Sequence, residues 1–426
     1  MTEPTPLEDL RSSSEGKTGP SSRGILVLSL LLLALGTLLR LSFYLLARPP
    51  LWGDEAMLAV SFSQSPISWL HGLSFNQTAP LGYLFLSWSV VRLFGDGVLA
   101  LRLVPFLAGV GSLFLYQRLA RRAIPGSWSV VAVALLALSA TAIYYSGEVK
   151  QYSLDLLTAT GLTLAVLPRP MTEERARWAA LAAFAAVVFS QASVFVLTGA
   201  AVWLWFQEPG AGRRLGVLFG VVACAGYLLY SRTMSPVTGA LMDTFWADTF
   251  LPLRLDPGTW WRAFTGLFGH VLGTPLPWIA GGVAVWGALG GRDRRLASLL
   301  ALPLVVATVA SLLQLYPFSP LRDGPRMGRL FLFALPGLTL LLTLGFRRLA
   351  KAGPVLAAIV LVLVGEQGFR TVTDPQTVFY RPDITRAISL IRAHPDTVVV
   401  PPHILPLIRY YSAREGLDLE IRPAVE

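Results

Sequence analysis

Long apolar runs separated by short, arginine-rich turns dominate this sequence and constrain its fold more than any single motif does. The runs cover residues 24–47, 80–94, 99–119, 128–144, 153–168, 178–190, 193–206, 215–231, 276–290, 296–315, 329–346 and 354–369. The first is about as long as a helix that crosses a bilayer. Hydrophobic residues make up 54% of the chain and charged residues 14%, which indicates a polytopic, all-α membrane protein.

The net charge of +10 does not indicate a nucleic-acid partner, because the basic residues are scattered as short clusters between the apolar runs. These clusters are Arg121-Arg122, then Arg169 with Arg175 and Arg177, then Arg213-Arg214, then Arg292 with Arg294 and Arg295, and finally Arg347-Arg348 with Lys351. Cytoplasmic connectors of membrane proteins carry an excess of Lys and Arg. We therefore place all five turns in the cytoplasm, with membrane lipid around the helices.

This orientation requires that one early apolar run does not cross the membrane. Three spans before Arg121-Arg122 would lead from a cytoplasmic N-terminus to the outside. The run 80–94 is short, opens with Pro80 and Gly82 and contains Arg92, so we predict that it lies as a helix in the outer interface. About eleven helices then span the cell (inner) membrane, with the N-terminus inside and the C-terminus outside.

The chain is predicted to have three parts. Residues 1–23 are rich in Ser, Pro, Glu and Thr and read as a disordered cytoplasmic tail, and residues 24–370 form the transmembrane domain. The segment 371–426 combines helical spacing with a β-branched run, Thr397 to Val400, and is predicted to be a small extracytoplasmic α/β cap. The single cysteine, Cys224, lies in an apolar run, which excludes disulfides and CxxC sites.

Two adjacent carboxylates, Asp54 and Glu55, follow the first apolar run at the outer surface of the membrane. Charged residues at such a position need a structural or a chemical reason. One interpretation is a cap on an interfacial helix, since carboxylates favour a helix N-terminus. The other is a catalytic carboxylate, acting as general base or as ligand of a divalent cation.

A second polar group lies between two apolar runs, from Tyr145 to Asp155. Glu148, Lys150 and Asp155 are charges at the outer rim of adjacent spans, and Asp155 falls inside the start of its helix. A carboxylate there would cost roughly 3 kcal/mol without a partner or a role. A salt bridge from Lys150 to Glu148 or Asp155 is the structural alternative to a functional site.

Three arginines, Arg322, Arg326 and Arg329, lie close together on the outer side, against the positive-inside trend. Guanidinium groups suit bidentate capture of phosphate oxygens, and Arg102 at the outer mouth of another span adds a fourth cation. Contact with lipid headgroups is the alternative. Together with the carboxylates, these cations suit attack on a lipid-carried donor that is activated by a phosphate, because the leaving group needs cations and the incoming hydroxyl needs a base.

The order of the outer motifs resembles that of bacterial family 39 glycosyltransferases, which share the GT-C fold with protein O-mannosyltransferases and the aminoarabinose transferase of lipid A. The motifs are Trp52-Gly53-Asp54-Glu55-Ala56, Gln77-Thr78-Ala79-Pro80-Leu81-Gly82-Tyr83, Leu93-Phe94-Gly95-Asp96, Ala100-Leu101-Arg102-Leu103, Tyr145 to Asp155, and Tyr316-Pro317 leading to Arg329. The resemblance covers roughly residues 24–350 and, more weakly, Arg409-Tyr410-Tyr411.

The resemblance implies a polyprenyl-phosphate sugar donor and a lipid, glycan or protein acceptor. It implies Asp54, Glu55 and Asp155 as catalytic residues. The donor would be bound by Arg102, Glu148, Lys150, Tyr152, Arg326 and Arg329. This chain has Ala79 where the aminoarabinose transferase has a lysine, so that phosphate contact must come from Lys150, Arg326 or Arg329. Dependence on a divalent metal stays open.

Two rival classes share some of these features. A transporter or flippase should show paired repeats, broken spans at matching positions and charges near mid-membrane, whereas the charges here cluster at one rim. An O-antigen ligase or polymerase would place its main basic loop elsewhere and would need no early Asp-Glu pair. Both rivals remain alternatives at the level of sequence.

Overall fold

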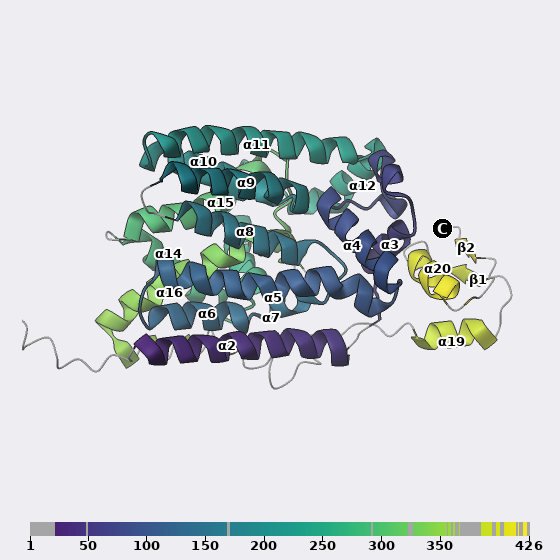
Figure 1. Cartoon of the computed structure of the whole chain (residues 1–426), viewed down its shortest axis with the longest axis horizontal. Coiled ribbons are helices and arrows are strands. Elements are labelled where there is room, and N and C mark those ends of the chain that lie inside the picture. The colour runs from purple at the N-terminus through teal and green to yellow at the C-terminus, as the bar shows by residue number, and fades with distance from the viewer. Residues whose placement is uncertain are drawn as a thin grey trace, which may run out of the picture.

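The chain forms a bundle of roughly parallel and antiparallel helices, with smaller elements gathered at one end (Figure 1). This computed structural model describes residues 22–47, 50–167, 171–290, 293–322, 327–355, 357–358, 361–362, 366, 385–393, 398–400, 404–414, 416 and 421–423. The predicted tail 1–23 lies outside the described residues except for its last two positions. Arg326 and most of the expected span 354–369 also lie outside them.

The described part holds five helices that are long and apolar enough to cross a membrane, or up to seven if each of two bent pairs is one span. The long helices are α2 (Ser22–Ser42), α5 (Val98–Ala123), α11 (Ala211–Thr233), α15 (Arg294–Leu312) and α16 (Leu335–Ala352), which the 3-10 turn η8 (Arg329–Ala334) precedes. The bent pairs join α6 (Trp128–Ala137) to α7 (Ala140–Ser146), and α13 (Pro257–Gly266) with the π-helical η5 (Leu267–Leu272) to α14 (Pro277–Leu289). Four further helices are α4 (Leu81–Phe94), α8 (Tyr152–Val166), α9 (Glu173–Phe189) and α10 (Ser193–Gln207). The chain is thus a multi-pass helical membrane protein, while the expected total of about eleven spans stays a prediction.

Burial divides the long helices into central and peripheral ones. Helix α16 is buried from Leu335 to Phe346, apart from the half-buried Gly337, and packs against α14, α15 and α6. A helix that is apolar on all sides belongs in the centre of a bundle, because every face must leave the solvent. Helix α2 exposes most of its leucines at the outside of the bundle.

A buried arginine accounts for the break between α6 and α7. The Arg40 side chain on α2 is fully buried, and its Nη1 donates to the carbonyl oxygen of Ala137, 3.2 Å away, in the last turn of α6. A cation at a helix C-terminus satisfies an open carbonyl and complements the helix dipole. The apolar run 128–144 predicted no interruption, so the tertiary contact with Arg40 overrides the local pattern.

The polar segments collect at one end of the bundle. Figure 1 shows α3 (Gly53–Phe62), α4, α12 (Pro236–Trp246) and α20 (Leu405–Arg414) at the same end. The short turns η2 (Pro66–His71) and η3 (Ser74–Asn76) connect α3 to α4, η4 (Ala247–Thr249) continues α12, and η7 (Ser319–Leu321) follows α15. The charge pattern predicted that the polar segments lie on one side of the membrane, and in the structure these segments lie at one end of the bundle.

The C-terminal segment contains α19 (Thr385–Ala393), β1 (Val398–Val400), α20 and β2 (Ile421–Pro423). The two strands pair in parallel, with Val398 opposite Ile421. A parallel pair requires a crossover, and α20 supplies it. That these elements form a separate extracytoplasmic cap stays a prediction.

The placement of the two ends can be tested by cysteine labelling in a Cys224→Ser background. Ser65 and Ser127 are both exposed and lie at the α3–α4 connection and before α6, respectively. We expect a membrane-impermeant maleimide applied to intact cells to label a Ser65→Cys variant but not a Ser127→Cys variant. Labelling of Ser127→Cys alone would reverse the proposed orientation.

Candidate active site

The first turn of α3 separates the two neighbouring carboxylates of the sequence motif. Glu55 is fully buried, whereas Asp54 is half-buried. The Glu55 Oε2 accepts a hydrogen bond of 3.2 Å from the backbone N–H of Trp52, just before the helix begins. Such a contact closes the first helical turn, because it satisfies a donor that the helix itself cannot pair.

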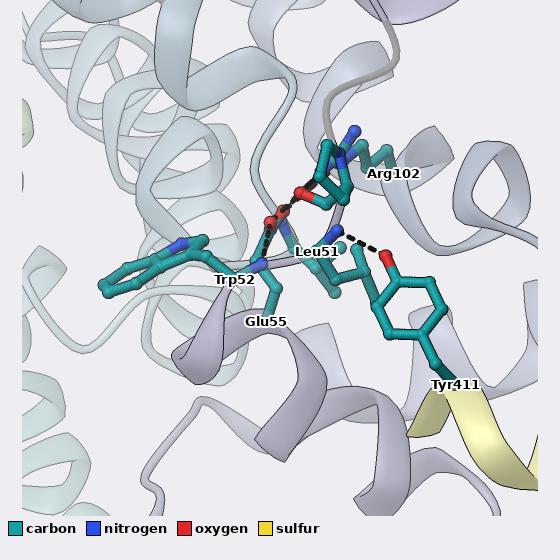
Figure 2. A network of polar contacts seen from close by, with 7 residues as sticks. Leu51, Trp52, Glu55, Arg102 and Tyr411 are labelled. Carbon is teal, nitrogen blue, oxygen red and sulfur yellow. Dashed lines mark hydrogen bonds and ion pairs between the residues drawn. The ribbon is translucent and has the colours of Figure 1, made fainter. Parts of the chain in front are cut away.

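Glu55 also ties two distant segments to this turn (Figure 2). Arg102 on α5 donates its Nη2 to Glu55 Oε2 at 3.0 Å and its Nε to Oε1 at 3.3 Å. The backbone N–H of Val149 donates to Oε1 at 2.8 Å. The two charged side chains are 1% and 0% exposed, so the carboxylate joins α3, α5 and the α7–α8 turn without solvent. The structure therefore places the predicted site residues Glu55 and Arg102 together, as partners of each other.

Asp54 is left available by this arrangement. It makes no hydrogen bond or ion pair to any residue that the structure describes, and its charge acts on Lys150 and Arg329. The interpretation of both carboxylates as a helix cap applies to Glu55, through its bond to the Trp52 backbone. A half-buried carboxylate beside two cations can accept a proton from a bound hydroxyl group.

Lys150 reaches into the site from the turn between α7 and α8. Its side chain is 5% exposed, and its Nζ donates to the amide oxygen Oε1 of Gln77 at 2.6 Å. The alternative of a salt bridge to Glu148 or Asp155 is wrong, because Nζ contacts a neutral amide instead. Burial lowers the pKa of Lys150 below its ordinary value, and the carboxylate of Asp54 acts against this shift.

Arg329, at the start of η8, is the most unusual cation of the site. The residue is 7% exposed, its Nε is buried without a hydrogen-bond partner, and the guanidinium group forms no ion pair with a described residue. The guanidinium carbon lies 5.6 Å from the centre of the Trp246 ring. Its charge acts on Tyr145, Tyr152, Asp54 and Glu148. A desolvated guanidinium group needs hydrogen-bond acceptors, so an arginine buried in this way favours a nearby anion.

The turn that carries Glu148 is tightly packed against its neighbours. Glu148 is fully buried, and a Cβ on the preceding Gly147 would overlap the ring of Phe43, which directly follows α2. The rings of Tyr145 and Tyr152 meet edge to face, with centroids 5.1 Å apart. Glycine at 147 thus permits the close approach that holds Glu148 and Tyr152 in the site.

Asp155 lies one turn further along α8 and has a partner of its own. Its Oδ1 accepts a hydrogen bond of 2.6 Å from Ser190 Oγ, which in turn accepts from the backbone N–H of Ser193 at the start of α10. Its charge acts on Tyr152, as does that of Asp54. The charge of the predicted catalytic residue Asp155 therefore acts on the site residue Tyr152. Its hydrogen bond, in contrast, connects α8 to the start of α10.

The arginine-rich segment does not act as one cluster in the described residues. Arg322 forms an ion pair with Asp248 and lies over the rings of Phe245 and Trp246. Of the two arginines in this segment that the structure describes, Arg329 is the one on which the charges of Asp54 and Glu148 act. Arg326 lies outside the described residues, so its role as a phosphate ligand stays a prediction.

Three residues of the site carried no role in the sequence analysis. Gln77 and Tyr411 lie within motifs that support the family resemblance, yet neither has a charge that would mark it. Trp246 is the last residue of α12 and lies in a region of the sequence that contained no motif. The structure reveals them through long-range contacts. Gln77 contacts Lys150, Tyr411 contacts Leu51, and Trp246 contacts Arg329.

Among the described residues, no group of three or more His, Cys, Asp or Glu side chains could hold a metal ion. The carboxylates of the site are Asp54, Glu55 and Glu148, of which Glu55 is paired with Arg102. The dependence on a divalent cation stays open.

No protein-family model matches this sequence, and no curated protein matches it in a sequence search. Solved structures do match. ArnT from Cupriavidus metallidurans in the apo state has a TM-score of 0.51 at 15% identity, covering 91% of this chain and 72% of that one. The same protein bound to undecaprenyl phosphate has a TM-score of 0.50 at 15% identity, covering 81% of this chain and 64% of that one.

An oligosaccharyltransferase from Archaeoglobus fulgidus, in complex with Zn and sulfate, has a TM-score of 0.52 at 11% identity. The match covers 92% of this chain and 62% of the oligosaccharyltransferase, so this chain spans less than two thirds of its length. The likeness to both proteins is one of fold. This likeness confirms the GT-C fold, which is the fold of the family that the sequence motifs resemble.

The buried pair Glu55–Arg102 can be tested by breaking it from one side. Removing one partner leaves an uncompensated buried charge and should cost about 3–5 kcal/mol. We expect Arg102→Met to lower the thermal stability of the protein in lipid nanodiscs sharply. The double variant Glu55→Gln with Arg102→Met should recover much of the loss. Equal melting temperatures for wild type and Arg102→Met would show that the pair does not hold the site together.

Proposed function

We propose that the chain is an integral-membrane glycosyltransferase that moves a sugar from a polyprenyl-phosphate donor to an acceptor on the extracytoplasmic side. The observation that carries this proposal is the buried guanidinium group of Arg329, which forms no ion pair with a described residue and on which the charge of the half-buried Asp54 carboxylate acts. The GT-C fold supports it, and one of the matching structures, ArnT, is bound to undecaprenyl phosphate.

The two charges have complementary tasks in such a transfer. The acceptor hydroxyl oxygen forms a bond to the anomeric carbon of the sugar, and its proton passes to Asp54. The bond from that carbon to the phosphate oxygen breaks, and its electron pair leaves with the polyprenyl phosphate. Arg329 and Lys150 stabilise the negative charge on the leaving phosphate, as preorganised cations do in a site that excludes water.

Lys150 takes the place of the lysine that is missing at Ala79. Its Nζ is bound to Gln77, two residues before Ala79, so its ammonium group is held against the same loop. The charges of Lys150 and Arg329 disfavour each other, and a bound phosphate would add to the compensation that Asp54 and Glu148 already give. In this proposal Glu55 and Arg102 position Asp54 and do not themselves contact the donor, while Tyr152 and Glu148 line the site.

The end of the bundle that carries the site is proposed to face the outside of the cell membrane. The basic turns that we place in the cytoplasm, such as that of Arg347, then lie at the other end. A lipid carrier presents its phosphate at the outer surface, at the depth of the helix ends. The sugar and the acceptor class are left for the experiment to identify.

The guanidinium geometry of Arg329 is testable by a charge-conserving change. Arg329→Lys keeps the charge but loses bidentate hydrogen bonding, and each lost charge-assisted bond is worth roughly 1.5–3 kcal/mol. We expect the variant to bind polyprenyl phosphate at least about tenfold more weakly. The matched control is Arg347→Lys, whose arginine pairs with Asp293 at the start of α15 and should leave binding unchanged. If both variants bind polyprenyl phosphate almost as well as wild type, Arg329 has a structural role and does not bind the phosphate.

The base assignment is tested by Asp54→Asn. Removing a general base usually costs about a hundredfold to ten-thousandfold in rate. We expect turnover, measured as release of polyprenyl phosphate from polyprenyl-phosphate sugars, to fall by that factor while binding of polyprenyl phosphate persists. Near-normal turnover of a folded Asp54→Asn enzyme would exclude Asp54 as the base.

A further inference from the structure

Helix α20, which lies more than 300 residues after the acidic motif, contacts the segment that positions it. The hydroxyl oxygen of Tyr411 accepts a hydrogen bond of 2.8 Å from the backbone N–H of Leu51, three residues before Asp54 (Figure 2). The side chain of Leu51 is buried in the cluster that includes Leu101 and Val149. The C-terminal helix therefore fixes the chain as it enters the first turn of α3.

The same helix also contacts the loop that binds Lys150. The guanidinium carbon of Arg409 lies 5.8 Å from the centre of the Phe75 ring. Phe75 and Asn76 have φ angles of 57° and 53°, in the left-handed region that side-chain-bearing residues rarely adopt. Such a conformation persists only where neighbours hold it. Gln77, the partner of Lys150, follows directly.

A third contact of α20 involves a segment other than the turn that carries Asp54. The Tyr410 hydroxyl donates to the backbone oxygen of Asp96 at 2.9 Å, just before α5. Tyr410 and Tyr411 are adjacent and each makes one buried or half-buried hydrogen bond to the backbone. They differ in what they hold, which makes them a natural pair for comparison.

We propose that α20 belongs to the active-site assembly, with Tyr411 as a positioning residue that orients the turn carrying Asp54. Tyr411 touches neither donor nor acceptor. It acts through the backbone of Leu51, which leads into the turn that Glu55 and Arg102 hold. The inference rests on the proposed role of Asp54, while the contact itself does not.

The test compares Tyr411→Phe with Tyr410→Phe in the full-length protein in nanodiscs. Each variant keeps its ring and loses one hydroxyl, so packing is preserved. Hydrogen exchange of the peptide containing Leu51 reports the contact directly, and kcat and KM for polyprenyl-phosphate sugars report its effect on catalysis. Loss of the hydrogen bond should accelerate exchange at Leu51 about fivefold to tenfold in Tyr411→Phe alone.

For the active enzyme we expect kcat to fall about tenfold in Tyr411→Phe, with KM for the donor within about twofold, because small misplacements of a catalytic group reduce the rate. Tyr410→Phe should match wild type in all three quantities. Faster exchange in Tyr411→Phe with an unchanged kcat would overturn the positioning role, and so would equal behaviour of the two variants. If wild type releases no polyprenyl phosphate from any donor, the proposed function fails, while selective exchange at Leu51 still supports the contact.

Discussion

The site depends on one buried ion pair, Glu55 with Arg102. Its two charged groups are shielded from solvent, and the carboxylate also accepts backbone N–H groups from Trp52 in its own turn and from Val149 in the α7–α8 turn. A buried pair of this kind adds little net stability compared with apolar side chains, yet it is costly to break. It therefore serves better to specify an arrangement than to stabilise a fold. Here it fixes the first turn of α3, which carries Asp54, against α5 and the α7–α8 turn, which carries Lys150.

Two adjacent acidic residues acquire different tasks because a helix turns by about 100° between them. Glu55 is bound within the junction, whereas Asp54 makes no hydrogen bond or ion pair with a described residue and its charge acts on Lys150 and Arg329. The cations differ in the same way. Arg102 is committed to Glu55, while Arg329 forms no ion pair with a described residue and its Nε has no hydrogen-bond partner. The proposed chemistry uses only the groups that the structure leaves available.

The sequence predicted the positions of the helices better than the contacts between them. Apolar runs mark most of the helical segments, because membrane helices are recognised by local composition. The break after α6 was missed, since it depends on Arg40, which lies about a hundred residues away in the chain. The order of motifs indicated the segments that meet at the site. It could not show that Arg102 pairs with Glu55 or that Lys150 binds Gln77, because such choices are made by tertiary contacts between residues with no local signal.

A structure of the protein in nanodiscs with bound polyprenyl phosphate tests the central claim most directly. The account predicts phosphate density within hydrogen-bonding distance of the Arg329 guanidinium group and the Lys150 ammonium group, with the Asp54 carboxylate facing the open side of the phosphate. The Glu55–Arg102 pair should stay intact in the bound state. Phosphate held by Arg322 or by the basic turns at the opposite end of the bundle, with Arg329 still unoccupied, would contradict the account.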